Sequence, residues 1–152
     1  MCEIIIEHVL PPSDSNRLEK LLLELDEVIT PKLSSRVKIE EYAKKLSENA
    51  ELFYVCDEGK DIGNCAIYLN NGEGGYISSI ALKKDWQRRG MGSLLWNAVL
   101  DCAKAKKIKY IDLMVSQFNS DAIAFYKKLH FEQIEVSDKW IKMRYEMGER
   151  FE

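Results

Sequence analysis

Apolar residues in the first third of the chain follow a strand period and then a helical period. Residues 3–10 are rich in β-branched side chains and end at two prolines, which predicts a strand. Residues 14–29 repeat apolar side chains every three or four positions, which predicts a helix that Pro31 prevents from continuing. Its expected N-cap is Ser13, Asp14 or Ser15. A second helix is expected to turn inward Ile39, Tyr42, Ala43 and Leu46.

Three strand-like runs then follow in quick succession, at 51–57, 61–70 and 76–82. Glycine lies in both connections, and glycine-rich turns between β-type runs predict an antiparallel meander. The second connection contains GEGG, which resembles a phosphate-binding loop in composition. It joins two strands and no helix follows it, so we interpret it as a hairpin turn.

The second half of the chain alternates helices and strands. A helix is predicted through about Lys106, a strand at 108–115, a helix at 119–130 and two final strands at 131–136 and 140–147. The resulting order, β-α-α-β-β-β-α-β-α-β-β, predicts a single α/β domain over residues 1–152, of the α+β type and with a mixed sheet.

Composition and charge narrow the class of protein. Of the 152 residues, 46% are apolar and 31% are charged, which is typical of a soluble globular protein. The formal net charge of −3 weighs against nucleic acid as a partner. No apolar run approaches the roughly 20 residues that span a bilayer, and the first residues lack the basic segment of a signal peptide. We therefore expect a cytoplasmic protein with no membrane partner.

The four cysteines predict neither a disulfide framework nor a metal site. They form no CxxC pair and show no paired spacing with the two histidines, His8 and His130. Cys56, Cys65 and Cys102 each lie in an apolar pattern, so they are expected to be reduced thiols in the core.

A loop with two glycines is the strongest candidate for binding chemistry. Residues 87–92 (QRRGMG) lie between a strand and an amphipathic helix, whose first N–H groups lack helical partners and carry partial positive charge. A phosphate placed there satisfies both. Gly90 and Gly92 have no Cβ to keep a ligand from the backbone, and Arg88 and Arg89 add positive charge. The loop predicts a pyrophosphate site, with a plain glycine-capped turn as the alternative.

Two common nucleotide-binding motifs do not fit this loop. The chain has no GxxxxGK[ST], which excludes a P-loop. It also lacks the third glycine of GxGxxG and an opening parallel βαβ unit, which excludes a Rossmann domain.

Two motifs instead resemble the GNAT superfamily of acetyl-CoA-dependent N-acetyltransferases. The first, Q/R-x-x-G-x-G/A after a strand, is matched by Gln87 to Gly92. The second, N-x-x-A-x-x-F/Y-Y-x-x-L-G-F, is matched at Asn119, Ala122, Phe125, Tyr126, Leu129 and Phe131, with His130 in place of the glycine. The motifs occur in the family's order, with a helix and a strand between them.

The resemblance implies a mixed, mostly antiparallel sheet of about seven strands flanked by about four helices, with acetyl-CoA as co-substrate. The residues that it assigns to acetyl-CoA are Ile80, Ala81 and Leu82 on the strand, Gln87, Arg88, Arg89, Gly90, Met91, Gly92 and Ser93 at the pyrophosphate, and Asn119 near the second motif. Tyr126 matches the tyrosine that faces the thioester sulfur. A tyrosine with a pKa of about 10 is protonated at neutral pH, so Tyr126 is the expected general acid.

The general base stays open. The candidates are Ser78 or Ser79 holding a water, a chain of waters, or one of the carboxylates of Glu40, Glu41, Glu51, Glu73 and Asp112. His130 ends the second motif's helix, where a left-handed cap is common, so we expect a cap rather than a catalytic role. Met114 and Trp86 also depart from the family's usual residues without breaking either motif.

The acceptor and the assembly are the least defined features. The resemblance implies direct attack by a primary amine of a small molecule or a protein, and it leaves a metabolite or amino sugar, a protein N-terminus or lysine, and an aminoacyl group open. The connection between the first two helices should select the acceptor, and its Arg36 could pair with an anionic group. The alternative functions are a non-catalytic acyl-CoA sensor or scaffold and a bare anion-binding domain. A homodimer through the C-terminal strands is also open.

Overall fold

A seven-stranded mixed sheet organises the computed structural model, which describes residues 3–148. The strands are β1 (Ile4–Val9), β2 (Glu51–Asp57), β3 (Lys60–Asn71), β4 (Gly74–Leu82), β5 (Tyr110–Ser116), β6 (Glu132–Val136) and β7 (Trp140–Glu146). They lie in the order β1-β2-β3-β4-β5-β7-β6, and only β4 and β5 pair in parallel. The predicted fold class is confirmed, and β3 and β4 pair across the GEGG segment as the hairpin that we expected.

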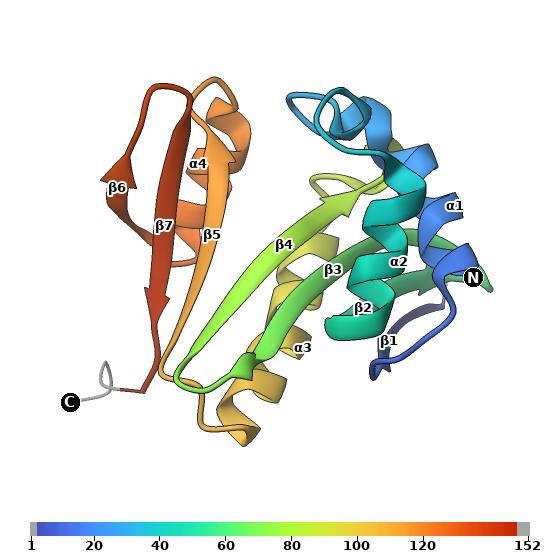
Figure 1. Cartoon of the computed structure of the whole chain (residues 1–152), viewed down its shortest axis with the longest axis horizontal. Helices are drawn as coiled ribbons and strands as arrows, with labels where there is room; N and C mark the ends of the chain where they lie inside the picture. Colours follow the sequence, from blue (N-terminus) through green and yellow to red (C-terminus); the bar gives the residue numbers. More distant parts are fainter. Residues whose placement is uncertain (1–2, 149–152) are drawn as a thin grey trace.

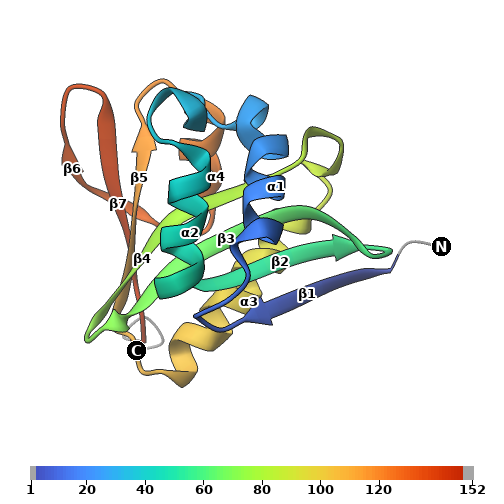
Figure 2. The same cartoon turned by 45° about the vertical axis from the view of Figure 1, so that its right-hand side comes forward.

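Four α-helices cover the two faces of this sheet (Figures 1 and 2). Helices α1 (Ser15–Leu25) and α2 (Ile39–Asn49) pack on one face, and α3 (Met91–Ala105) and α4 (Ser120–Lys128) pack on the other. Successive residues of a strand point to opposite faces. In β2, Leu52 and Tyr54 therefore join the core under α1 and α2, while Phe53 and Val55 join the core under α3. Among residues 3–148, no helix has the length and apolar character needed to cross a membrane.

The first helix is shorter than the predicted range 14–29. Asp14 is its N-cap, and α1 ends at Leu25, after which Asp26–Val28 form a 3-10 turn. The Asp26 carboxylate accepts hydrogen bonds from the backbone N–H of Ser34 at 2.8 Å and from its hydroxyl at 2.6 Å. These bonds fold the connection to α2 back on itself. Val28 and Ile29 consequently leave the helix face on which the sequence pattern placed them.

Strands β4 and β5 pair over only part of their length. The ladder joins Gly74–Ile77 of β4 to 110–113 of β5, and beyond Ile77 the two strands separate (Figure 1). The β3–β4 register also shifts at this point, because Ala66 pairs with Ser79 while the next residue pairs with Ile77. Ser78 is thus the extra residue of a β-bulge, and bulges bend the strand that carries them. The bend accompanies an opening in the middle of the sheet.

Candidate functional site

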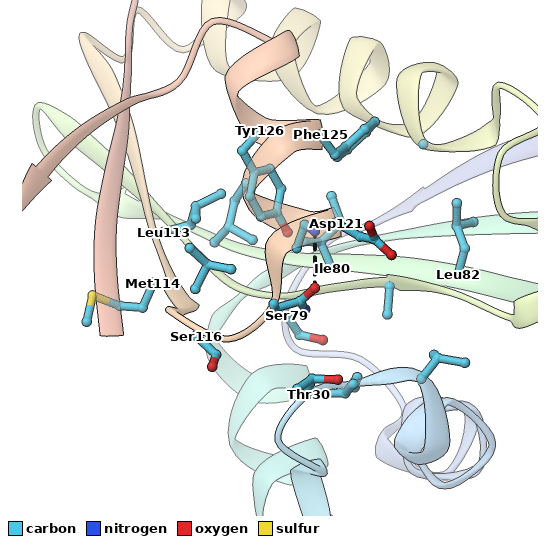
Figure 3. Close-up of a pocket in the computed structure, with 18 of the residues that line it drawn as sticks. Thr30, Ser79, Ile80, Leu82, Leu113, Met114, Ser116, Asp121, Phe125 and Tyr126 are labelled. Atoms are coloured by element: carbon cyan, nitrogen blue, oxygen red, sulfur yellow. Dashed lines mark hydrogen bonds between the residues drawn. The ribbon is translucent and has the colours of Figure 1, made fainter. Parts of the chain in front are cut away.

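The opening between β4 and β5 is a cleft of about 940 Å³, shown in close-up in Figure 3. One wall is the end of β4, and the facing wall is the end of β5 with α4. The connection between α1 and α2 borders it on a third side, and the start of α3 on the fourth. The cleft therefore joins segments from both halves of the sequence at the point where the sheet splits.

The end of β4 presents unpaired peptide groups to this cleft. The backbone N–H of Lys83 donates to the Ile62 carbonyl of β3 at 2.8 Å. Peptide groups of an antiparallel strand face its two neighbours alternately, so those of Ala81 face β3 and those of Ile80 and Leu82 face away from it. Because β5 has already separated, an extended ligand in the cleft can hydrogen-bond to the peptide groups of Ile80 and to the N–H of Leu82 as a strand would.

The two-glycine loop leads directly into α3 at one end of the cleft. Gly90 is the N-cap residue of α3, with a left-handed φ of 83° that glycine adopts without strain. A Cβ built on Gly90 meets nothing within 4 Å, so this position opens onto free space. The N–H groups of Met91, Gly92 and Ser93 belong to the first turn of α3, where helices leave donors free for an anion.

Gly92 has a packing reason to be glycine in addition to the one that we expected. A Cβ there would lie 2.9 Å from the Phe125 ring, so the missing side chain lets α4 pack closely against the start of α3. Gly92 thus adjusts the contact between two walls of the cleft, and the expectation that both glycines clear a path for a ligand stays a prediction.

The side chains of the loop are mainly occupied with holding the loop itself. The Gln87 amide donates to the Leu82 carbonyl at 2.9 Å, and Arg89 donates to the Asp85 carbonyl at 3.0 Å. Arg88 is 83% exposed and lies 3.5 Å from the Asp121 carboxylate. Its left-handed φ of 61° places it at a sharp change of chain direction just before α3. Arg88 is thus the loop cation that is both exposed and on the cleft wall.

The structure brings most of the predicted binding residues to the cleft wall. Those that line it are Ile80, Ala81, Leu82, Gln87, Arg88, Gly90, Gly92, Ser93 and Asn119. Arg89 and Met91 do not line it, although the backbone of Met91 lies in the first turn of α3. The Asn119 side chain accepts the Ala122 N–H at 3.1 Å, so it serves as the N-cap of α4. Contact of these residues with a ligand stays a prediction.

Tyr126 lies on α4 across the cleft from β4, and Figure 3 shows its ring extending toward Ile80 and Ser79. The ring packs between Phe125 and Phe131, with centroids 5.7 Å from each. Burial raises the pKa of its hydroxyl well above the usual value, and the nearby Cys65 acts in the same direction. The hydroxyl therefore keeps its proton at neutral pH, as a general acid must.

The carboxylates considered as general bases lie elsewhere. The cleft-lining residues do not include Glu40, Glu41, Glu51, Glu73 and Asp112, so none of these carboxylates stands on the cleft wall. Asp112 instead forms a two-point contact with Arg144, at 2.7 and 3.0 Å. Among residues 3–148, the carboxylate that lines the cleft is that of Asp121, which sequence reasoning missed. The signal that could have revealed Asp121 is its position two residues after Asn119, the first residue of the second motif.

The end of the cleft beyond Tyr126 is bordered by aromatic and basic side chains. The side chains that line this end are Tyr42, Tyr76, Arg36 and Trp140. The Arg36 guanidinium lies 5.2 Å from the centre of the Trp140 ring, within the range of a cation–π contact across the cleft. Burial raises the pKa of Tyr42 and of Tyr76, while the positive charge of Arg36 acts in the opposite direction on both. Arg36 therefore places positive charge at this end.

The three departures from the family's usual residues have structural explanations. His130 has a left-handed φ of 79°, and its N–H bonds to the Lys127 carbonyl at 2.9 Å, as expected of a cap after α4. The Trp86 indole donates to Asp57 at 3.1 Å, which ties the loop to β2. Met114 is 41% exposed and lines the cleft.

Tyr42 holds the bulge of β4 in place. Its hydroxyl donates to the Ser78 carbonyl at 2.9 Å and lies 2.6 Å from the Ser78 hydroxyl. Tyr42→Phe leaves both Ser78 oxygens without this partner, so we expect the free energy of unfolding to fall by about 1–3 kcal/mol. Denaturant unfolding measures this loss, with Tyr68→Phe on β3 as the control; equal stability of the two variants would contradict this role.

Together, the fold and the cleft set the unpaired end of a strand and the N-terminus of a helix around one opening, an arrangement suited to an extended ligand that carries phosphate. The chain belongs to the acetyltransferase (GNAT) family, because the family model matches residues 17–131.

Two curated proteins are similar to the chain in sequence, and one solved structure is similar to it in fold. The chain is 35% identical over 98 residues to an uncharacterised N-acetyltransferase of Methanocaldococcus jannaschii, a match that covers 60% of this chain and 43% of that protein. It is 27% identical over 150 residues to the thialysine N-epsilon-acetyltransferase of Bos taurus, covering 88% and 87% of the two chains. A GNAT family acetyltransferase of Elizabethkingia anophelis, solved with acetyl-CoA bound, superimposes with a TM-score of 0.71 and 18% identity, covering 95% and 98% of the two chains.

Proposed function

We propose that this protein transfers an acetyl group from acetyl-CoA to a primary amine by direct attack. The observation that carries the proposal is the split between β4 and β5, which sets a free peptide edge, a helix N-terminus and the Tyr126 hydroxyl around one cleft. The structural relative that holds acetyl-CoA supports the same choice of donor.

The chain's own groups fit the parts of acetyl-CoA. The first turn of α3, with Arg88 beside it, suits a pyrophosphate, because helix N–H groups and a guanidinium both bind phosphate oxygens. The peptide groups of Ile80 and the N–H of Leu82 suit the amide-containing pantetheine arm, while the Leu82 carbonyl accepts from Gln87. The left-handed Gly90 leaves open space where the phosphates would approach.

Acetyl-CoA supplies the activated acyl group as a thioester. The Ile80 N–H would stabilise the negative charge that develops on the thioester oxygen, as a preorganised backbone donor does. The new C–N bond forms as the C–S bond breaks, and Tyr126 gives its proton to the departing sulfur. Solvent then returns a proton to Tyr126.

The amine must lose a proton before or during its attack. Ser78 and Ser79 both line the cleft, and the Ser78 hydroxyl is engaged by Tyr42. We propose that the proton leaves through water held by the Ser79 hydroxyl, which links the cleft to solvent. A serine is too weak a base to accept the proton itself, so water is the carrier.

The acceptor that we favour is a small molecule with a primary amine. The cleft's acceptor end is bounded by the α1–α2 connection, Tyr76 and Trp140, and the bovine relative is named for the small amino acid thialysine. A peptide amine is the second acceptor class.

Release of the CoA thiol tests the proposal. Purified protein is mixed with acetyl-CoA and a panel of small amines, amino sugars and peptides, and free thiol is measured over time. We expect acetyl-CoA to bind and at least one amine to accelerate thiol release. Binding without turnover on every amine would instead favour an acyl-CoA sensor or scaffold. Competition by free pyrophosphate as strong as by CoA would favour a bare anion-binding domain.

A further inference from the structure

A cluster of three potential metal ligands lies outside the cleft, on the face of the sheet that α3 covers. It consists of His8 on β1, Glu51 on β2 and Cys102 near the end of α3. None of the three lines the cleft, and the proposed transfer of acetyl groups uses none of them. We propose that this cluster binds a Zn²⁺ ion, with water completing a tetrahedral site.

The ligand atoms already lie close to the positions that zinc requires. His8 Nε2 is 2.7 Å from Glu51 Oε1, Cys102 Sγ is 3.4 Å from the same oxygen, and Sγ is 4.0 Å from Nε2. Tetrahedral zinc bonds of about 2.0–2.3 Å set such atoms about 3.3–3.6 Å apart. To reach these spacings, His8 Nε2 and Glu51 Oε1 must move apart by about half an ångström. His8 Nε2 and Cys102 Sγ must come closer by about the same amount.

Surrounding groups orient two of the three ligands. The His8 ring stacks on Phe53, with centroids 4.2 Å apart and planes within 6°, so its Nε2 is held toward Glu51. Lys106 lies 3.2 Å from the second oxygen of Glu51, which leaves Oε1 for the ion. Partners that orient metal ligands in this way are a regular part of zinc sites.

Charge and access are compatible with a divalent cation. The two positive charges of Zn²⁺ would be cancelled by the Glu51 carboxylate and a Cys102 thiolate, with neutral His8 adding no charge. The thiol proton passes to solvent as zinc binds. The Glu51 side chain is 9% exposed, whereas that of His8 is 35% exposed. The ion therefore has an entry path from solvent to a largely buried oxygen.

The wide separation of the three ligands along the chain explains why the sequence predicted no such site. They stand at positions 8, 51 and 102, far from the short spacings of zinc motifs. Their convergence arises because His8 pairs opposite Phe53 in the β1–β2 ladder, while Glu51 is two residues before Phe53 on the same face. Bound zinc would tie the edge strand β1 to β2 and to the end of α3.

Zinc binding by the whole chain tests this proposal. Reduced protein, stripped of metal with a chelator, is titrated with Zn²⁺ against a competing chromophoric chelator and separately with Co²⁺. We expect one ion per chain, a thiolate-to-cobalt charge-transfer absorption and a melting temperature that rises with zinc. His8→Phe, which keeps an aromatic ring on Phe53, and Cys102→Ala should each weaken zinc affinity by more than about 100-fold.

Two matched cysteine variants serve as controls. Cys56→Ser removes a thiol that is also partly buried and beside a carboxylate, Asp61, and Cys2→Ser removes one that lies outside the described residues. Both should retain native zinc affinity. Circular dichroism checks that each variant folds, with Cys102→Ser as a second variant if Cys102→Ala does not. Native affinity in folded His8→Phe or Cys102→Ala, or a cobalt spectrum without the thiolate band, would overturn the proposal.

Discussion

Tyr126→Phe should lower kcat by about 10²–10⁴-fold while the Kd for acetyl-CoA stays within about twofold of native, because it removes only the proton donor. The ring itself would still pack between Phe125 and Phe131, so the fold and the cleft wall are retained. Single-turnover measurement of thiol release reports the loss in the chemical step, and calorimetry reports acetyl-CoA binding. Tyr110→Phe, a tyrosine on β5 outside the cleft, is the control and should keep native kcat.

The pH dependence gives a second test of the same role. Burial raises the pKa of Tyr126 above its usual value of about 10, so the active, protonated form persists as pH rises from 7 to about 10. Over this interval kcat should therefore show no decline due to this group, and activity is lost only when the pH passes the raised pKa. Native turnover in Tyr126→Phe would remove the hydroxyl from the mechanism.

Gly90→Val should weaken acetyl-CoA binding by about tenfold or more. A left-handed backbone costs an L residue about 1–2 kcal/mol, and a β-branched side chain is the least tolerant, so the loop before α3 would be forced out of its present shape. The new side chain would also enter the open space in front of the first turn of α3. Since about 1.4 kcal/mol changes Kd tenfold, calorimetry with acetyl-CoA can resolve the effect.

The matched control for this change is Gly72→Val. Gly72 has a similar left-handed φ of 86° and an equally open Cβ direction, but it lies in the β3–β4 turn away from the cleft. Its variant should lose stability and keep native affinity. Gly90→Asn should fall between native and Gly90→Val, because asparagine tolerates the left-handed region. Native acetyl-CoA affinity in Gly90→Val would show that the loop is not the pyrophosphate site.

Local sequence patterns predicted most elements but not all of their limits. Residues 14–29 repeat apolar side chains at helical spacing throughout, yet α1 ends at Leu25. Periodicity records only which side chains are apolar, and Val28 and Ile29 pack against the core under α1 and α2 and line the cleft without being part of the helix. The carboxylate contact between Asp26 and Ser34 that ends the helix joins residues eight apart, which no helical period reveals.

The candidate site was predictable to the extent that it rests on short motifs. The loop at 87–92 was recognised from its glycines and its place before a helix, and Tyr126 from the resemblance of the second motif to the GNAT superfamily. Asp121 and the bulge at Ser78 were not, since a bulge depends on the partner strand and Asp121 becomes relevant only when α4 faces β4. The carboxylates considered as bases, such as Glu51, lie off the cleft wall. Their positions in the sequence did not tell which face or end of the sheet they would occupy. The cytoplasmic location and the homodimer stay predictions.

By itself, the sequence determined the succession of helices and strands, the glycine loop before α3 and the family to which the chain belongs. These features depend on residues close together in the chain, where side-chain period, glycine conformation and helix capping act locally. Only the tertiary structure decided that β4 and β5 separate beyond Ile77, that Tyr126 faces the free edge of β4, and that His8, Glu51 and Cys102 converge. Each of these results from pairing and packing between distant segments, whose geometry no local pattern contains.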